Sequence, residues 1–424
     1  MQRKIVKGLL LSMCVSSLVY AAGFKIPEQS LASVALSAAY VANANGADAS
    51  YYNPANMVWN EDKNLIEGDL TYIGLTKVHF KGLAYSKASS SFVPTDEYSK
   101  SEQFLVPTLH FSSKDQGGWR YGLSITAPGG LSKRWNGAVT SASAKEFTLK
   151  VIEINPTFAY KVNDKFAIGG GLRLLYSDGK VKADGGALYS EDMTGDSYDF
   201  GYNLALSYRP NEALKLAATY RSKIDMTIKG SASGHINKYL LTSDPADLAT
   251  LIPYNTSANV KLPLPATLNL ATSYTFKEKT TVEFVYERVY WSSYKQLDFN
   301  FNDAIVEAVL GKPKAKNWKD TNTYRIGVTH QYNDKLKFMA GFAIDNSPIP
   351  SKTLGFELPD SDAKLYSVGL EYKYSNNLTL GISYLYDDKE TRTITASDAN
   401  INGIVGTFKD TRAHLLTAGF KYRF

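Results

Sequence analysis

Hydrophobic and polar residues alternate along most of the chain, in segments of about ten residues that polar stretches separate. The last segment shows the pattern most clearly, because every second residue from Leu416 to Phe424 is apolar and Thr417, Gly419, Lys421 and Arg423 lie between them. Successive side chains of a strand point to opposite faces. One apolar face and one polar face suit a strand between lipid and a wet interior. The pattern therefore predicts an all-β fold, a transmembrane antiparallel β-barrel.

The same alternation recurs in other parts of the chain, and the connections between the segments differ in length. Further strands are expected within 147–161, 165–178, 197–209, 213–229, 265–276, 279–291, 322–332, 336–345, 366–374 and 378–386. Short turns such as 163–164 and 375–377 are typical of the periplasmic end of such barrels. The long connections are expected outside the cell, with short helices in 244–252 and 302–310: 127–146, 179–196, 231–264, 292–320, 346–361 and 388–411.

The N-terminus carries an export signal. Arg3, Lys4 and Lys7 precede an apolar run over 8–19, and small residues follow at 21–22, so residues 1–21 are predicted to be a signal peptide. An uncleaved anchor is disfavoured, because the run is shorter than the ~18 residues that a membrane-spanning helix needs. The export signal also favours a barrel over a soluble β-sandwich, which would alternate in the same way.

Residues 22–64 lack strand alternation and are rich in alanine, serine and asparagine. A wide barrel has a lumen that its own side chains cannot fill. We therefore expect 22–64 to form a small N-terminal hatch or plug with short helices, and 65–424 to form the barrel. The alternative is a disordered periplasmic tail.

Composition narrows the class of protein. The chain has 29 tyrosines, which suit a membrane interface, and its net charge of +6 is too small to indicate nucleic-acid binding. The sole cysteine, Cys14, falls in the signal peptide, and no metal-binding or nucleotide-binding motif occurs. We expect no cofactor and no metal. The five histidines, none in a hydrolase-like setting, argue against the alternative of an outer-membrane lipid hydrolase: His79, His110, His235, His330 and His414.

Several short motifs, taken together and in order, resemble the FadL family of outer-membrane transporters of hydrophobic compounds. They run from the start of the mature chain almost to its end: Ala22-Gly23-Phe24, Asn53-Pro54-Ala55, 127–131 with Trp135, 264–268, 290–294, 324–327, 345–350 and 358–360. The resemblance implies about fourteen strands, an N-terminal hatch, and passive diffusion of long-chain fatty acids with lateral release through the wall. Aromatic-hydrocarbon uptake is the alternative within the family, and a general porin or adhesin barrel is the alternative outside it.

The resemblance also implies site residues. Phe24 would reach into an internal binding site, and Asn53, Pro54 and Ala55 would form the gating turn of the hatch, facing a kinked strand of the wall. A fatty-acid carboxylate needs a buried cation, and the family uses a lysine and an arginine. Lys314 is favoured for the lysine, with Lys316 beside it, while Lys180 is the candidate where the arginine is missing; a solvated lysine loop is the alternative.

The same reading sets the expected partners and location. The protein should act as a monomeric transporter in the bacterial outer membrane rather than as an enzyme. Its partners would be a long-chain fatty acid or another hydrophobic small molecule, outer-membrane lipid and lipopolysaccharide, and no nucleic acid.

Overall fold

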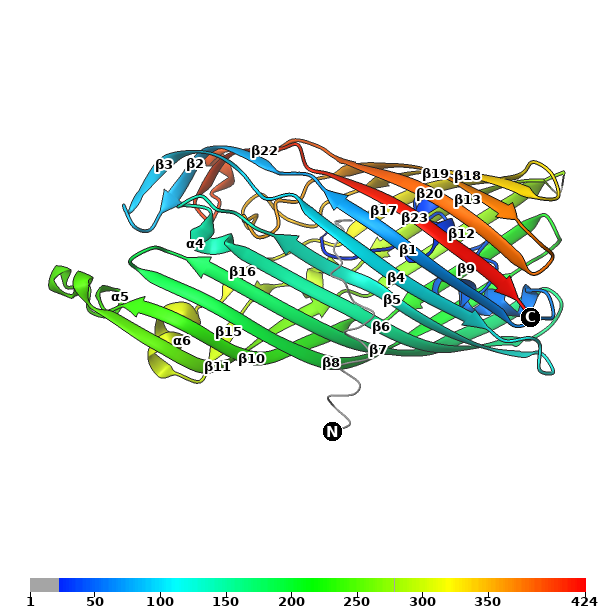
Figure 1. Ribbon diagram of the computed structural model, residues 1–424, viewed down its shortest axis with the longest axis horizontal. Coiled ribbons are helices and arrows are strands. Elements are labelled where there is room, and N and C mark those ends of the chain that lie inside the picture. The colour runs from blue at the N-terminus through cyan, green and yellow to red at the C-terminus, as the bar shows by residue number, and fades with distance from the viewer. Residues whose placement is uncertain (1–22, 278) are drawn as a thin grey trace.

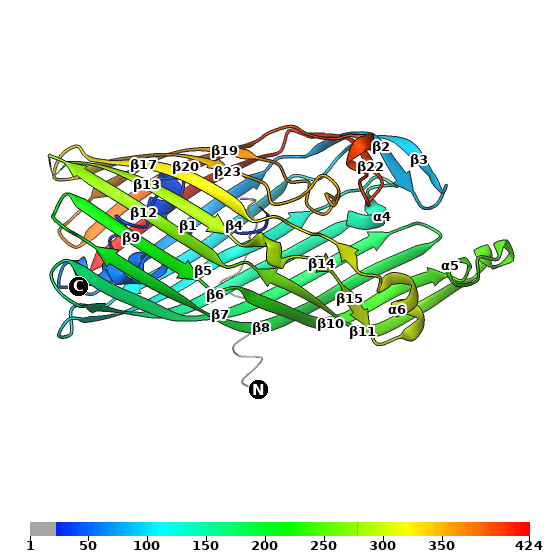
Figure 2. The same cartoon turned by 180° about the vertical axis from the view of Figure 1, so that it is seen from behind.

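A computed structural model describes residues 23–277 and 279–424, and the predicted signal peptide lies outside these residues. The described part forms a closed antiparallel barrel (Figures 1 and 2). Three of its wall strands are each divided into two segments, so the 17 segments of the main sheet make 14 wall strands over the described residues. The expected all-β barrel is thereby confirmed. β1 (Leu65–Leu75) pairs with β23 (Arg412–Arg423) and closes the wall.

The remaining wall strands follow one another in sequence order. They are β4 (Glu102–Ser112), β5 (Trp119–Lys133), β6 (Glu146–Lys161), β7 (Phe166–Asp184), β8 (Tyr189–Tyr208), β9 (Leu214–Arg221) with β10 (Ile224–Asn237), β12 (Thr267–Phe276) with β11 (Leu251–Leu264), β13 (Thr280–Val289) with β15 (Phe299–Phe301), β17 (Thr321–Gln331), β18 (Leu336–Asp345), β19 (Ala363–Lys373) and β20 (Leu378–Lys389).

The outer surface of the wall shows where the membrane lies. Outward residues of β7 and β8 are exposed and apolar, up to 72% exposed at Phe200. This band ends at Tyr176 and Tyr198, whose rings lie 5.0 Å apart, and the next outward pair is Asp178 and Asp196. From Phe166 to Tyr176 the strand rises about 33 Å, or about 25 Å along the membrane normal at the tilt of such barrels. That height matches the apolar band of an outer-membrane protein.

The wall strands continue beyond this band on the extracellular side, where long loops were expected. β7 and β8 pair as far as Asp184 and Ser190, although 179–196 was expected to be a loop, and that expectation is wrong. The reason is physical: outside the membrane the outward residues face water, so they are charged and no longer produce the lipid-type alternation. β5, β10 and β11 likewise extend into connections that were expected to be irregular.

Short elements complete the extracellular end. A four-stranded sheet has the order β21-β22-β2-β3 and a two-stranded sheet pairs β14 with β16. The helix expected in 302–310 is present, capped by Asp303 and ended at Gly311, and a 3-10 turn lies in 244–252. The bounds are β2 (His79–Ser86), β3 (Ser91–Tyr98), β21 (Arg392–Ile394), β22 (Ile404–Lys409), β14 (Gln296–Leu297), β16 (Lys314–Ala315), α4 (Ser141–Ala144), α5 (Tyr239–Thr242), η2 (Pro245–Ala249), η3 (Trp291–Ser293), α6 (Ala304–Leu310) and η4 (Ala396–Asp398).

Residues 23–64, which we call the N-terminal segment, lie inside the barrel, blue in Figures 1 and 2. The segment contains α2 (Leu31–Ala35), α3 (Ala49–Tyr52) and η1 (Pro54–Trp59), and most of its residues are buried. Its backbone is held by side chains of the wall: Glu283 accepts hydrogen bonds from the N–H groups of Val41, Ala42 and Asn43. In the described part of the chain, no helix is long and apolar enough to cross a membrane.

Candidate functional site

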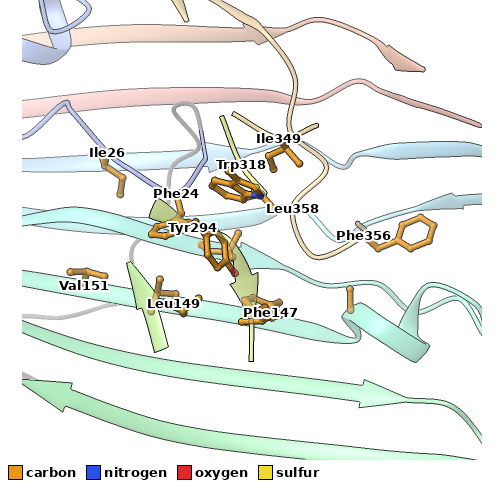
Figure 3. Close-up of a cluster of buried hydrophobic side chains, with 14 of the residues drawn as sticks. Phe24, Ile26, Phe147, Leu149, Val151, Tyr294, Trp318, Ile349, Phe356 and Leu358 are labelled. Carbon is orange, nitrogen blue, oxygen red and sulfur yellow. The ribbon is translucent and has the colours of Figure 1, made fainter. Parts of the chain in front are cut away.

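Phe24 lies in a buried aromatic cluster, beside Tyr294 and Trp318 (Figure 3). Its ring centre is 4.8 Å from that of Trp291, 5.9 Å from that of Trp318 and 6.3 Å from that of Tyr294, and its side chain is 2% exposed. Gly23 precedes it with φ +72°, and a Cβ there would lie 2.6 Å from a Trp291 ring carbon. Only glycine can therefore lead the chain into this cluster.

A small apolar cavity, the inner pocket, adjoins Phe24. Its lining combines the aromatic cluster, aliphatic side chains of β5, β6 and β11, and one ion pair: Phe24, Leu131, Phe147, Leu149, Leu262, Tyr294, Lys316, Trp318, Glu357 and Leu358. Lys316 is 5% exposed and its Nζ pairs with the Glu357 carboxylate. Burial alone would raise the pKa of Glu357, but the adjacent Lys316 holds it below its ordinary value. The pocket thus has one buried ammonium group, already paired.

A larger cavity of about 570 Å³, the outer groove, opens at the extracellular end. Its apolar lining comes from loops and strand ends, including Tyr85, Phe92, Phe299 and Phe356. Lys87, Lys312, Lys314 and Lys316 also line it, against the carboxylates of Glu191 and Glu357. Burial, and then the neighbouring Lys314, lower the pKa of Lys87. The groove is therefore amphipathic, with an excess of lysine.

The structure brings together some of the site residues predicted from the sequence and separates others. Phe24 and Lys316 share the inner pocket, and Lys314 and Lys316 share the outer groove. Lys180 lies on the outer face of the wall, where its Nζ is 3.2 Å from a carboxylate oxygen of Glu146, because the inward positions of β7 are Gly179 and Val181. The structure therefore does not bring the Lys180 side chain to the pocket. The sequence analysis missed Glu357. This residue is identified only by the folded structure, in which its loop lies beside Lys316.

The turn at Asn53-Pro54-Ala55 lies deep in the barrel and is fully buried. Asn53 donates from its side-chain amide to the carbonyl of Val41, 3.1 Å away, and Pro54 begins η1. A Cβ at Gly169 of β7 would lie 2.6 Å from the Ala55 nitrogen, so this turn packs closely on β7. We expected it to face the kinked part of the wall.

The kinked wall is at β5, and a different part of the N-terminal segment faces it. The pairing of β5 with β6 shifts register between Thr126 and Gly129. β4 pairs with β5 only from Leu109 to Ser112, so the stretch 102–108 of β4 pairs with β1 but has no ladder to β5. We call this interruption the wall gap. It is closed from inside by the stretch 24–29, where Gln29 exchanges hydrogen bonds with the Ala127 backbone.

Two histidine–serine contacts bear on the hydrolase alternative. His110 is buried between Ser124 and the backbone oxygen of Gln29, where it ties the N-terminal segment to β5. Ser190 of β8 and His235 of β10 are 2.8 Å apart on paired strands, but Nε2 of His235 faces the Gly186 carbonyl, where a catalytic triad has a carboxylate. Over residues 23–277 and 279–424, no group of His, Cys, Asp and Glu is arranged to hold a metal ion.

A closed barrel plugged from within, with an aromatic and lysine-lined cavity reaching the extracellular end, defines an outer-membrane channel for apolar or amphipathic molecules. Residues 12–424 match the family described as "Outer membrane protein transport protein (OMPP1/FadL/TodX)", and the chain belongs to this family. The predicted family and the outer-membrane location are thereby confirmed. The protein is an outer-membrane transporter of hydrophobic compounds.

Particular relatives show the range within the family. A long-chain fatty acid transport protein of Salmonella typhi is 25% identical over 311 residues, which cover 66% of this chain and 69% of that protein. A Pseudomonas aeruginosa FadL homologue superposes with a TM-score of 0.81 at 17% identity, over 95% of this chain and 100% of that chain. The Ralstonia pickettii toluene transporter TbuX superposes with a TM-score of 0.67 at 18% identity, over 93% and 98%. These two structures support the fold.

Proposed function

We propose that this protein carries long-chain fatty acids across the outer membrane by passive diffusion. The observation that carries the proposal is Lys316, a buried ammonium group at the junction of the inner pocket and the outer groove. A fatty acid has a carboxylate that is costly to bury alone, and an apolar tail that gains about 25 cal/mol for each Å² of apolar surface removed from water. A lysine within an apolar cavity meets both needs.

The lysines of the outer groove fit the same cargo. Lys87, Lys312 and Lys314 would attract the carboxylate at the cell surface, and Lys316 would then receive it beside Phe24. Because Glu357 competes for Lys316, the bound carboxylate is held loosely enough to leave. The family relative from Salmonella typhi, named as a long-chain fatty acid transport protein, supports this choice.

The proposed exit is sideways, through the wall gap into the membrane. Phe104, Val106 and Ala127 make the inner surface of the gap apolar, and the stretch 24–29 covers it as the moving part of a hatch. Displacement of Phe24 by cargo would loosen this stretch, because Phe24 and Ile26 are bound to the kink through the backbone of Gly130 and Pro128. Asn53, Pro54 and Ala55 would anchor the hatch rather than move.

Aromatic-hydrocarbon uptake is the second candidate, favoured by the aromatic cluster around Phe24 and by the likeness to a toluene transporter. An uncharged cargo has no use for Lys316. The two candidates therefore differ in how they depend on charge.

The test is uptake of labelled oleate and of toluene by cells with and without the gene, and with variants. Lys316→Gln combined with Glu357→Gln removes both charges and retains the hydrogen bond; we expect it to lower oleate uptake about tenfold, the loss of a charge-assisted contact. Glu357→Gln alone should strengthen oleate binding, because Lys316 loses its competitor. Lys180→Gln, on the outer face, is the matched control. Toluene uptake that falls on deletion, with oleate unchanged, would select the aromatic candidate.

A further inference from the structure

A second apolar cavity lies beneath the extracellular part of the wall and shares lining residues with both the inner pocket and the outer groove. We call it the tail niche. Its surface is almost entirely apolar, and its lining residues come from six neighbouring wall strands and from the loop strand β14: Phe147, Thr148, Leu149, Gly179, Lys180, Val181, Met193, Thr194, Gly195, Ile228, Gly230, Ser231, Ala258, Asn259, Val260, Leu262, Leu297 and Phe299. The cavity volume is about 40 Å³ here, against about 570 Å³ in the outer groove, so the niche is narrow.

The niche exists because one level of the wall carries no large inward side chain. Gly179, Gly195 and Gly230 are register partners across β7, β8 and β10, and Ala258 of β11 continues the row. Three glycines and an alanine leave this row from β7 to β11 without large side chains, and the Ile228 side chain lies over Gly179 and Gly195. The row begins at Leu149 of β6, which pairs with Gly179. Interiors are ordinarily packed without voids, so an apolar recess of this kind indicates space kept for an apolar group.

The niche is a dead end rather than an exit. At this level the ladders from β6 to β11 are continuous, in contrast to the wall gap between β4 and β5. The outward neighbours of the glycines include Lys180, Thr194 and Ser231, so the wall here faces the polar zone above the apolar band of the barrel. A molecule in the niche cannot leave through the wall and must return to the inner pocket or the outer groove.

Phe147 connects the three cavities. It lines the inner pocket, the outer groove and the tail niche, and Leu149 and Leu262 line both the inner pocket and the niche. Figure 3 shows Phe147 and Leu149 beside Tyr294, on the side of the pocket away from Ile349. A ligand whose head is held at Lys316 therefore has a direct path around Phe147 into the niche.

We infer that the tail niche receives the far end of an unbranched alkyl chain whose carboxylate is bound at Lys316, and so selects cargo by chain length. The inference rests on the proposed function. A column of methylene groups is narrower than an aromatic ring, and each methylene that enters gains about 0.8 kcal/mol of burial. A short acid or a single aromatic ring fills the inner pocket and leaves the niche empty.

The experiment measures binding of hexanoate, laurate and palmitate by calorimetry, with the full-length barrel in outer-membrane lipid nanodiscs. Ala258→Leu fills the niche from the wall. We expect it to weaken palmitate binding by about tenfold, equivalent to two excluded methylenes, and to leave hexanoate within about twofold. Ile228→Ala enlarges the niche and should tighten palmitate binding relative to laurate. Ala246→Leu, the same change on an exposed 3-10 turn, is the control.

The outcomes separate the two proposals. Equal weakening of hexanoate and palmitate by Ala258→Leu, or no change in palmitate, would overturn the role of the niche while the proposed function stands. If the unaltered protein binds none of the three acids, the proposed function fails, and the role of the niche fails with it.

Discussion

The protonation state of an ionisable residue buried in the lumen depends on its immediate surroundings. Glu28 of the N-terminal segment is 6% exposed, and its Oε1 is 4.0 Å from Arg325. Burial raises the pKa of Glu28 to about 7, although Arg325 and Lys25 act in the opposite direction, and Asp345 adds to the rise. At neutral pH this residue is therefore close to its titration point, inside the part of the protein that covers the wall gap.

This leads to a pH prediction. A carboxyl group whose pKa is higher in the folded state favours the protonated protein, so its stabilising contribution is complete below pH 4.5 and is lost as the pH rises through about 7. Glu28→Gln is neutral at every pH. We expect it to melt higher than the unaltered protein at pH 8 and to melt equally near pH 4.5, with heat-dependent gel mobility of the barrel as the measurement. A constant difference across this range would contradict the assignment.

At the scale of elements, β4 and β5 differ from every continuous pair of wall strands described above. Their ladder covers only four residue pairs, and the inward side chains beyond it, Phe104 and Val106, are apolar and buried. A carboxylate bound at Lys316 does not touch these residues. Binding and passage through the wall gap can therefore be altered separately.

The corresponding variant is Val106→Arg, with Val106→Leu as the control. A charge in the gap should slow oleate uptake by cells at least about tenfold, since burying it without a partner is costly, while calorimetric affinity for oleate stays within about twofold. Uptake at the normal rate would rule out this gap as the exit.

Individual strands also show how far sequence reasoning reaches. Residues 416–424 were predicted correctly because lipid on one side and water on the other impose alternation on β23. The division of 213–229 at Ser222 was not predictable, because it depends on which neighbours each half pairs with. Lys180 was misplaced for a related reason: above the membrane both faces of β7 tolerate polar residues, so alternation no longer says which side is inside. Contacts such as Lys316 with Glu357 join loops whose meeting depends on the whole barrel.

The whole molecule is positioned in the membrane by its apolar band. Leu172 is 63% exposed and lies on the outer face of β7, between Phe166 and Tyr176. Leu172→Arg should lower the free energy of unfolding by about 2–4 kcal/mol, the cost of arginine at the middle of a bilayer. Leu83→Arg, on the extracellular sheet and also exposed, should change it by less than about 0.5 kcal/mol. Urea-induced unfolding from lipid vesicles measures both, and equal effects would mean that the band is misplaced.

The N-terminal segment is hydrogen-bonded to wall and loop residues that come far later in the chain. Ser37 bonds to Ser367, Gly23 bonds to Asp360, and Asn64 exchanges two backbone hydrogen bonds of 3.0 Å with Phe424. Contacts of such sequence separation form late and slowly, because the intervening chain must first be ordered. An early part of the chain is thus held by parts that follow it by more than 300 residues. The order of assembly therefore cannot follow the order of synthesis. The N-terminal segment can form its final contacts only after the later wall strands are in place.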